Sequence, residues 1–369
     1  MKNRFKLLTA TALVLSLTSV YATTSSMQKV APKKPEPEVK TYKTSDVYLS
    51  SPDYTVGVYF TPQALQPTAS NLHEIAVAYP LPVPTPKWFI QDVKPQYHFG
   101  FDLGLNAMFH STNSCLTFNW QHFHSSDSTT KTVPSSDMVG PFFEIGPDAA
   151  PYNTATGHAH FLLNEANIDY GILVNFGSRA QANLFAGVSY AYIKEVVVGQ
   201  YSNPTNTFTR TIKSPSNFSG AGPQVGVNFA YRIAKGFHLA GDASAAILVG
   251  KMKNHTSYSS NSPLLAGLNI TPPNSQSTHV AIRTQVVPAF EGKLGFNYVY
   301  NYYKHYMVSL EAGYQAQVYI NAIQSTDMGS EVTLNTVAAP TVGVYARTFQ
   351  RTLSDFALAG PYLTLTLGF

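Results

Sequence analysis

Apolar and polar residues alternate one by one along much of the chain beyond residue 53. The clearest stretch is HFGFDLGLNAMF at residues 98–109, where Phe99, Phe101, Leu103 and Leu105 occupy every second position. A period of two places successive side chains on opposite faces of a β-strand. An amphipathic helix would instead need apolar residues at positions i, i+3 and i+4. The pattern therefore predicts a strand.

Ten segments follow this pattern, and together they predict an all-β protein. Most are near the ~9–11 residues that a tilted strand needs to cross a bilayer, and they are longer than the ~5–6 residues usual in globular sheets. The predicted strands are 54–60, 98–109, 116–121, 166–176, 183–192, 221–231, 237–249, 286–300, 306–320 and 357–369.

The connections between these segments alternate strictly between long and short. The short ones are GSRAQA at 177–182, RIAKG at 232–236, NYYKH at 301–305 and a link between the second and third segments. Short periplasmic turns and long extracellular loops are typical of outer-membrane barrels. We therefore predict a transmembrane antiparallel β-barrel of about ten strands, within a range of about 8 to 12, with both ends of the barrel chain on the short-turn side.

The last segment, PYLTLTLGF, keeps the alternation up to the final residue. Leu363, Leu365, Leu367 and Phe369 share one face. Because a closed barrel has no free edge, its last strand must pair with its first. A terminal Phe369 with apolar residues two, four and six positions earlier also resembles the signal that barrel assembly machinery reads.

A large secreted β-sandwich would alternate in the same way, and composition argues against it. The outer polar face of a sandwich meets solvent and normally carries Lys and Glu. Here the polar positions are mainly Gly, Asn, Gln, Ser and Thr, and charged residues make up only 12% of the chain, about half the usual ~25%. Tyr and Phe gather near the strand ends on the apolar face, as interfacial girdles require.

The front of the chain predicts export. Residues 1–22 read as a signal peptide, because three basic residues precede a short apolar stretch that closes with Val20-Tyr21-Ala22. Residues 23–46 are rich in Pro, Lys and Glu and predict a flexible periplasmic segment, which leaves 47–369 for the barrel. The first 46 residues carry a net charge of +5, and the remainder carries −1. The nearly neutral remainder argues against nucleic acid as a partner.

The inward face of the predicted barrel carries several charged residues. Buried charges must be paired or hydrated, so they predict either a water-filled pore with a mild cation preference or a polar network that closes the lumen. Inward glycines at 100, 104, 171, 226, 295 and 313 favour some free space. The candidate pore-lining residues are Asp102, Asp169, Asp242, Glu291, Lys293 and Glu311.

The first long loop contains YPLPVPTPKW at 79–88, which is too Pro-rich for a helix. We expect it to fold into the mouth as a constriction, so deleting residues 66–90 should enlarge the conductance. Cys115 is the single cysteine and excludes an intrachain disulfide. A small buried residue is favoured over a cross-link between subunits.

Two groups of residues raise the alternative of a barrel enzyme. His122, His124 and Asp127 lie close together in sequence, and His158 and His160 form an x-H-x-H pair suited to a metal. A third ligand with firm spacing is missing. Ser126 beside His124 does not make a triad by adjacency alone. We therefore expect no enzyme, no catalytic residue, no metal and no cofactor.

Several stretches resemble the Legionella-type major outer membrane porin family over roughly 54–369. They are LQPTASNLHEIAVAYPLPVPTPKW at 65–88, YHFGFDLGL at 97–105, FHSSD at 123–127, NIDYGILVNFGSR at 167–179, GAGPQVGVN at 220–228, VVPAFEGKLGFNY at 286–298 and GPYLTLTLGF at 360–369. The resemblance implies a pore-forming protein of the Gram-negative outer membrane without catalytic residues. It also implies assemblies linked by cysteine, for which this chain offers only Cys115.

Three functions follow as alternatives. The first is a pore that lets small hydrophilic solutes or ions diffuse passively. The second is a surface structural or adhesive barrel with a plugged lumen, which acts through its extracellular loops. The third is a barrel enzyme acting on lipid or peptide, which would respond to substitution of His124 or Ser126. The expected partners are outer-membrane lipid and lipopolysaccharide and the barrel assembly machinery, with a homo-oligomer left open.

Overall fold

The computed structural model describes residues 54–79, 87–134, 138–140, 152–203, 205, 207–261, 274–303, 306–335 and 341–369. The chain divides into two units, residues 1–42 and 43–369, and the described residues all belong to the second. The predicted signal peptide and the flexible segment lie outside them. Among the described residues, no helix is long and apolar enough to cross a membrane.

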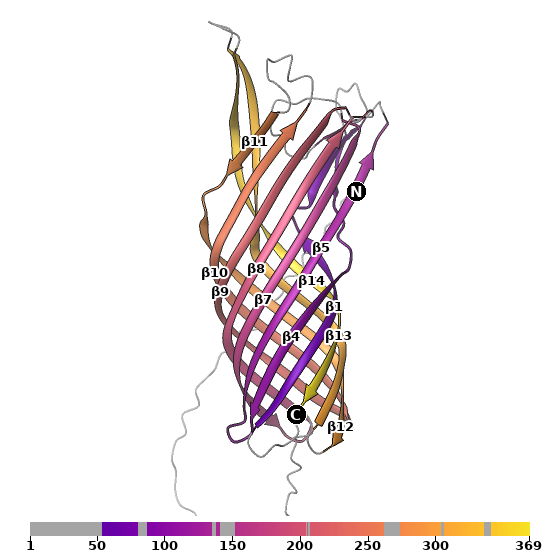
Figure 1. The fold of residues 1–369 in the computed structure, drawn as a ribbon, viewed down its shortest axis with the longest axis vertical. Coiled ribbons are helices and arrows are strands. Elements are labelled where there is room, and N and C mark those ends of the chain that lie inside the picture. Colours follow the sequence, from indigo (N-terminus) through magenta and orange to yellow (C-terminus); the bar gives the residue numbers. More distant parts are fainter. Residues whose placement is uncertain are drawn as a thin grey trace, which may run out of the picture. The chain divides into compact units, whose positions relative to one another are not determined.

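Ten antiparallel strands pair edge to edge into a closed ring (Figure 1). The ring follows the order β10-β12-β13-β14-β1-β4-β5-β7-β8-β9 and returns to β10. Each of the ten predicted segments lies in one of these strands, which confirms the predicted barrel. The ring strands are β1 (Tyr54–Ala69), β4 (His98–Phe109), β5 (Ser114–Thr132), β7 (Thr154–Phe176), β8 (Ala180–Ser202), β9 (Thr209–Ala234), β10 (Phe237–Ser260), β12 (Arg283–Tyr303), β13 (Tyr306–Asn335) and β14 (Thr341–Gly368).

The last strand closes the ring against the first, as the unbroken terminal alternation predicts. Gly57 of β1 is opposite Gly368 of β14. Val56 N donates to Phe369 O at 3.0 Å, and Phe369 N donates to Val56 O at 2.9 Å. Phe369 therefore lies within the β1–β14 seam, at the end of the barrel that also carries the short turns (Figure 1).

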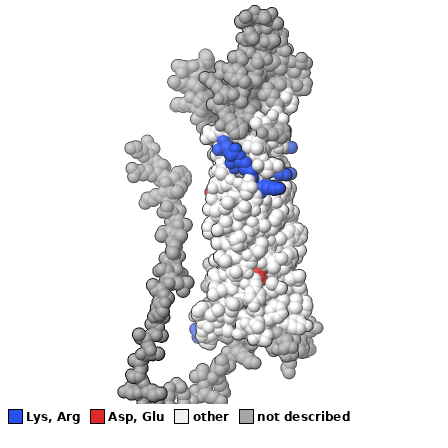
Figure 2. Space-filling view, turned by 90° about the vertical axis from the view of Figure 1, so that its left-hand side faces the viewer, with Lys and Arg blue, Asp and Glu red and all other residues white. Residues whose placement is uncertain are grey.

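A broad apolar belt surrounds the lower part of the barrel. Its side chains are large and exposed; Ile168 and Leu294, for example, are 57% and 55% exposed. Figure 2 shows this belt as a mostly uncharged surface, with Lys and Arg gathered above it. A contiguous apolar surface of this size is unfavourable in water and is the outer face that a transmembrane barrel presents to lipid.

The strands continue well beyond the belt, which the sequence did not predict. β13 spans 30 residues and β14 spans 28, against predicted lengths near 15 and 13. Pairing between β12 and β13 ends at Ala289 and Tyr319. The register of β13 then shifts between Tyr319 and Ile323, where Asn321 adopts a left-handed φ of 59°.

Beyond this bulge, β13 leaves β12 and packs across the barrel onto β9 and β10. Gln324 N donates to Ser216 Oγ at 2.9 Å. Asn254 Nδ2 donates to Gln324 O at 2.8 Å, and Thr326 Oγ1 donates to Asn254 Oδ1 at 2.8 Å. These contacts, which we call the latch, hold the upper part of β13 over the lumen.

Several loops contain strands of their own. β2 (His73–Tyr79) and β3 (Lys87–Asp92) of the first long loop form a small antiparallel sheet with β6 (Met138–Gly140) of the loop between β5 and β7. β11 (Asn274–His279) pairs with the upper part of β10. None of these four strands was predicted, since short strands in loops lack a long alternation. Residues 80–86 of the Pro-rich stretch lie outside the described residues.

Candidate functional site: the barrel lumen

All six charged residues predicted to line the lumen do lie on its inner face. They come from five strands: β4, β7, β10, β12 and β13. Asp102 is the most buried of them, at 2% exposed. Their role in conduction stays a prediction. The inward positions are Asp102, Asp169, Asp242, Glu291, Lys293 and Glu311.

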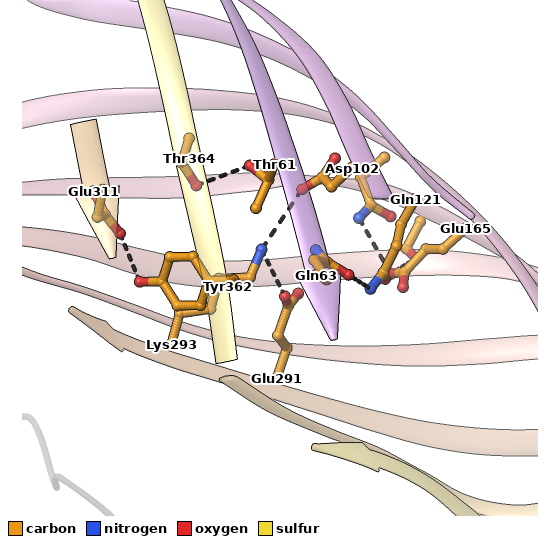
Figure 3. A network of polar contacts seen from close by, with 12 residues as sticks. Thr61, Gln63, Asp102, Gln121, Glu165, Glu291, Lys293, Glu311, Tyr362 and Thr364 are labelled. Carbon is orange, nitrogen blue, oxygen red and sulfur yellow. Dashed lines mark hydrogen bonds and ion pairs between the residues drawn. The ribbon is translucent and has the colours of Figure 1, made fainter. Parts of the chain in front are cut away.

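Lys293 lies at the centre of this group. Its Nζ is 3.0 Å from Glu291 Oε1 and 3.6 Å from Asp102 Oδ2 (Figure 3). The Lys293 and Asp102 side chains are 16% and 3% exposed. Breaking such a buried pair by removing one partner leaves an uncompensated charge, so Lys293 stabilises two carboxylates that would otherwise be costly.

Further hydrogen bonds tie neighbouring strands together on the inner face. Tyr362 Oη donates to Glu311 Oε1 at 2.6 Å. The hydroxyls of Thr61 and Thr364 lie 2.8 Å apart across the closing seam, as Figure 3 shows. The polar side chains of the inner face therefore line the lumen and also link neighbouring strands through hydrogen bonds.

Sequence reasoning missed two buried acids. Glu165 accepts hydrogen bonds from Tyr319 Oη, from Asn167 Nδ2 at 3.1 Å and from Ser189 Oγ at 3.3 Å. The predicted strand began one residue later, at 166, although Glu165 continues the inward parity of Asn167. Glu195 accepts from Asn71 Nδ2 at 2.7 Å and was missed because its strand was ended at 192.

Four of the six charged residues, Asp169, Asp242, Glu291 and Lys293, line a cavity of ≈ 90 Å³, which we call the chamber. The chamber is large enough for several waters. Most of its lining is polar, and the lining residues are Tyr59, Thr117, Asn119, Asn167, Asp169, Gly171, Asn183, Phe185, Gln224, Asn228, Asp242, Ser244, Glu291 and Lys293.

Buried apolar side chains fill the lumen on the extracellular side of the chamber. Phe356 is fully buried and stacks on Phe161 and Tyr319, with ring centroids 5.5 Å and 6.1 Å apart. Leu72 and Val93, which flank β2 and β3 in the first loop, belong to the same cluster. We call this cluster the apolar layer: Leu65, Leu72, Val93, Phe123, Ala159, Phe161, Leu163, Ala191, Ile193, Val197, Phe218, Ala246, Leu248, Met252, Val287, Tyr319, Ala322, Ile323, Phe356 and Leu358.

The inward glycines differ in the space that they provide. Gly171 lines the chamber, in line with the expected free space. A Cβ on Gly104 would instead collide with the ring of Tyr59, and a Cβ on Gly226 would collide with Phe185, so these two glycines make room for a large inward side chain from the next strand. This arrangement packs aromatic rings over strand glycines.

The histidine and serine candidates share the outer face of β5 and β7, and Asp127 is separated from them on the inner face. Along β5, His124 is exposed on the outer face while Asp127 is buried on the inner face. Asp127 instead lies 2.9 Å from His98 Nε2. His160 lies opposite Ser126 on the outer face. Within the part of the chain that the structure describes, no three His, Cys, Asp or Glu side chains converge as metal ligands.

Cys115 is buried, as favoured from the sequence. It is 8% exposed, and its Sγ lies 3.6 Å from Thr117 Oγ1. Its position places the thiol inside the barrel and away from the belt that faces lipid.

A closed ring of ten antiparallel strands with an apolar outer belt and a polar inner face defines an outer-membrane β-barrel protein. The family model described as the Legionella pneumophila major outer membrane protein precursor matches residues 40–369. The chain therefore belongs to the Legionella major outer membrane protein family and is a protein of the bacterial outer membrane.

Solved barrels resemble the chain more distantly. The outer membrane protease OmpT from Escherichia coli is 9% identical, with a TM-score of 0.40 over 88% of this chain and 99% of its own. The translocator domain of the autotransporter NalP from Neisseria meningitidis is 9% identical, with a TM-score of 0.31 over 88% and 91%. The Pseudomonas putida toluene transporter TodX is 6% identical, with a TM-score of 0.27 over 88% and 91%. These values carry no argument about function. No curated protein matches the sequence.

Proposed function

We propose that the protein is a narrow, gated pore for ions and small hydrophilic solutes, with the apolar layer as the gate. The observation that carries this proposal is the chamber. Charged side chains are costly inside a protein unless they are paired or hydrated, and a barrel that served only as an anchor could be filled with apolar side chains throughout. A chamber that collects carboxylates is consistent with a path for cations.

The apolar layer supports a gate because apolar constrictions exclude water and ions by dewetting. Part of this layer does not belong to the ring. Leu72 follows the end of β1 and Val93 follows β3. Asn71, which precedes Leu72, ties this segment to the barrel wall by donating a hydrogen bond to Glu195 of β8. A segment outside the ring can move without breaking the strand pairing of the barrel.

The test is single-channel conductance of the refolded mature chain, residues 23–369, in a planar lipid bilayer. A variant with residues 71–92 replaced by a short Gly-Ser linker should open more often and conduct more than the parent. Reversal potential under a salt gradient should show a preference for cations. This design sharpens the sequence-based deletion of 66–90, because residues 66–69 are part of β1 and pair with β14.

Leu72→Ser is the milder companion variant, and Tyr97→Ser is its control, because Tyr97 lies in the same loop and is exposed. Heat-modifiable mobility establishes folding in each case. Silence of the linker variant in its folded state would overturn the gated pore.

A second candidate is a surface structural or adhesive barrel, and the long extension of the strands favours it. β13 and β14 continue far past the belt, and the latch fixes β13 to β9 and β10. Strands that extend in this way are a scaffold from which loops can act outside the membrane. Silent bilayers together with loop-dependent binding to cells would support this function.

A further inference from the structure

The chamber contains more negative than positive charge. Three carboxylates and one ammonium line it: Asp169, Asp242, Glu291 and Lys293. Lys293 is the cross-strand neighbour of Asp242, yet its ammonium is within ion-pair distance of Asp102 and Glu291. Among the described residues, Asp169 and Asp242 have no basic side chain within ion-pair distance.

Three residues that line the chamber each carry a buried oxygen atom without a hydrogen-bond partner. Asp169 Oδ1, Asn167 Oδ1 and Gln224 Oε1 are buried and unpartnered, and these residues are 8%, 2% and 6% exposed. A buried polar atom normally has a partner, and each exception calls for a ligand, a water or an ion. The three residues all line the chamber.

Strand register explains why these oxygens lie close together. Gly187 of β8 is opposite Asp169 of β7 on one side and opposite Gln224 of β9 on the other. A Cβ on Gly187 would collide with Asp169 Oδ1, so the glycine makes the space that the carboxylate occupies. Asp169 and Gln224 thus occupy the same level of the barrel on either side of a residue that has no side chain.

We propose that the chamber binds one hydrated divalent cation of the calcium and magnesium type. Asp169 and Asp242 supply the two compensating negative charges, and Asn167 and Gln224 supply neutral oxygens. Carboxylates, amide carbonyls and retained waters are the ligands that these hard cations take. Sulfur and imidazole ligands are missing from the described lining, which disfavours zinc and copper.

We expect the cation to enter the chamber from the short-turn end of the barrel. Below the chamber the inner face carries polar side chains, among them Asn106, Gln181 and Asn297. The apolar layer closes the other side. Binding therefore does not require the gate to open, and the inference stands independently of conduction.

The experiment is isothermal titration calorimetry on the refolded mature chain, residues 23–369, in lipopolysaccharide-free detergent after treatment with a chelator. Calcium chloride and magnesium chloride are the titrants, against a background of sodium chloride. We expect one divalent site per chain. Asp169→Asn and Asp242→Asn should each weaken binding tenfold or more.

Glu195→Gln is the matched control, because Glu195 is a buried inward acid on β8 that does not line the chamber. It should bind the cation as the parent does. Absence of divalent binding to the parent, or equal binding by the Asp169 and Glu195 variants, would overturn the proposal.

A second readout separates this site from a merely structural role. In chelator, Asp169→Asn should melt at a higher temperature than the parent, because an uncompensated buried charge has been removed. Calcium should raise the melting temperature of the parent and leave that of Asp169→Asn unchanged. A lower melting temperature in chelator, with the calcium response retained, would contradict the assignment.

Discussion

The two halves of the lumen share one ring of strands and one inward parity, yet they are filled by opposite chemistry. In the chamber, inward positions carry Asp, Glu, Asn and Gln around a cavity. In the apolar layer, the inward positions of the same strands carry Leu, Ile and Phe, and several are fully buried. β7 passes from Asp169 and Glu165 to Leu163 and Phe161 within nine residues.

This difference shows that strand parity decides which side chains enter the lumen, whereas their position along the strand decides whether water can accompany them. Apolar side chains gain free energy by leaving water. Buried polar groups lose free energy on leaving water unless they are paired or stay hydrated. The chamber therefore depends on charge balance, and the apolar layer depends on close packing.

The largest effect should follow from removing the ammonium group of Lys293, which pairs with two carboxylates on the inner face. Lys293→Met leaves Asp102 and Glu291 buried without a counter-charge, and breaking a buried pair in this way costs about 3–5 kcal/mol. The free energy of unfolding, measured by urea titration in lipid vesicles through tryptophan fluorescence, should fall by that amount. At low pH the deficit should shrink, since protonated carboxylates need no partner.

Lys293→Arg keeps the charge and is the control, for which we expect a loss of well under half that of Lys293→Met. Equal losses for the two variants would mean that the shape of the side chain, rather than its charge, holds the chamber together.

A smaller effect is expected in the apolar layer. Phe356→Ala removes a fully buried ring that stacks on Phe161 and Tyr319, and truncation of a buried Phe costs about 3 kcal/mol. Unlike the loss in Lys293→Met, this one should not depend on pH, and the same urea titration at two pH values measures it.

Phe296→Ala is the matched control, because Phe296 points outward and is 63% exposed. It leaves no cavity in the layer, so its loss should be clearly smaller. If both Phe variants lost the same stability, close packing would not distinguish the layer from the lipid-facing belt.

The sequence predicted the ring well because the bilayer imposes a strict alternation. Outward positions such as Leu363 and Leu365 face lipid, and inward positions such as Thr364 face the lumen, so the period of two persists over the whole belt. The same parity placed Asp102 and Lys293 correctly on the inner face.

Above the belt this signal fades, and the predictions failed there. Beyond Tyr319, β13 no longer alternates between lipid and lumen, and the shift at Asn321 changes its parity. The apolar layer was missed for a related reason. Residues 161–163 read FLL, a run with no alternation, because Leu162 and its two neighbours are apolar on both faces. Which glycines would be covered by rings from the next strand also depends on register, which a single sequence does not contain.

The latch should give the smallest of the three losses and the most local one. Asn254→Ala removes the side chain that donates to Pro215 O and Gln324 O and accepts from Thr326 Oγ1. Leaving such buried groups without partners costs about 2 kcal/mol. Amide hydrogen exchange should quicken around residues 322–326, while β1, β4 and β5 should keep the protection of the parent.

Thr326→Val is the milder companion variant. It removes only one of the three hydrogen bonds of the Asn254 side chain, so it should quicken exchange less than Asn254→Ala. A uniform increase across all ring strands would show that Asn254 supports the whole barrel. A local increase would show that the upper part of β13 opens separately, because the apolar layer beneath it holds the ring closed by packing that does not depend on the latch.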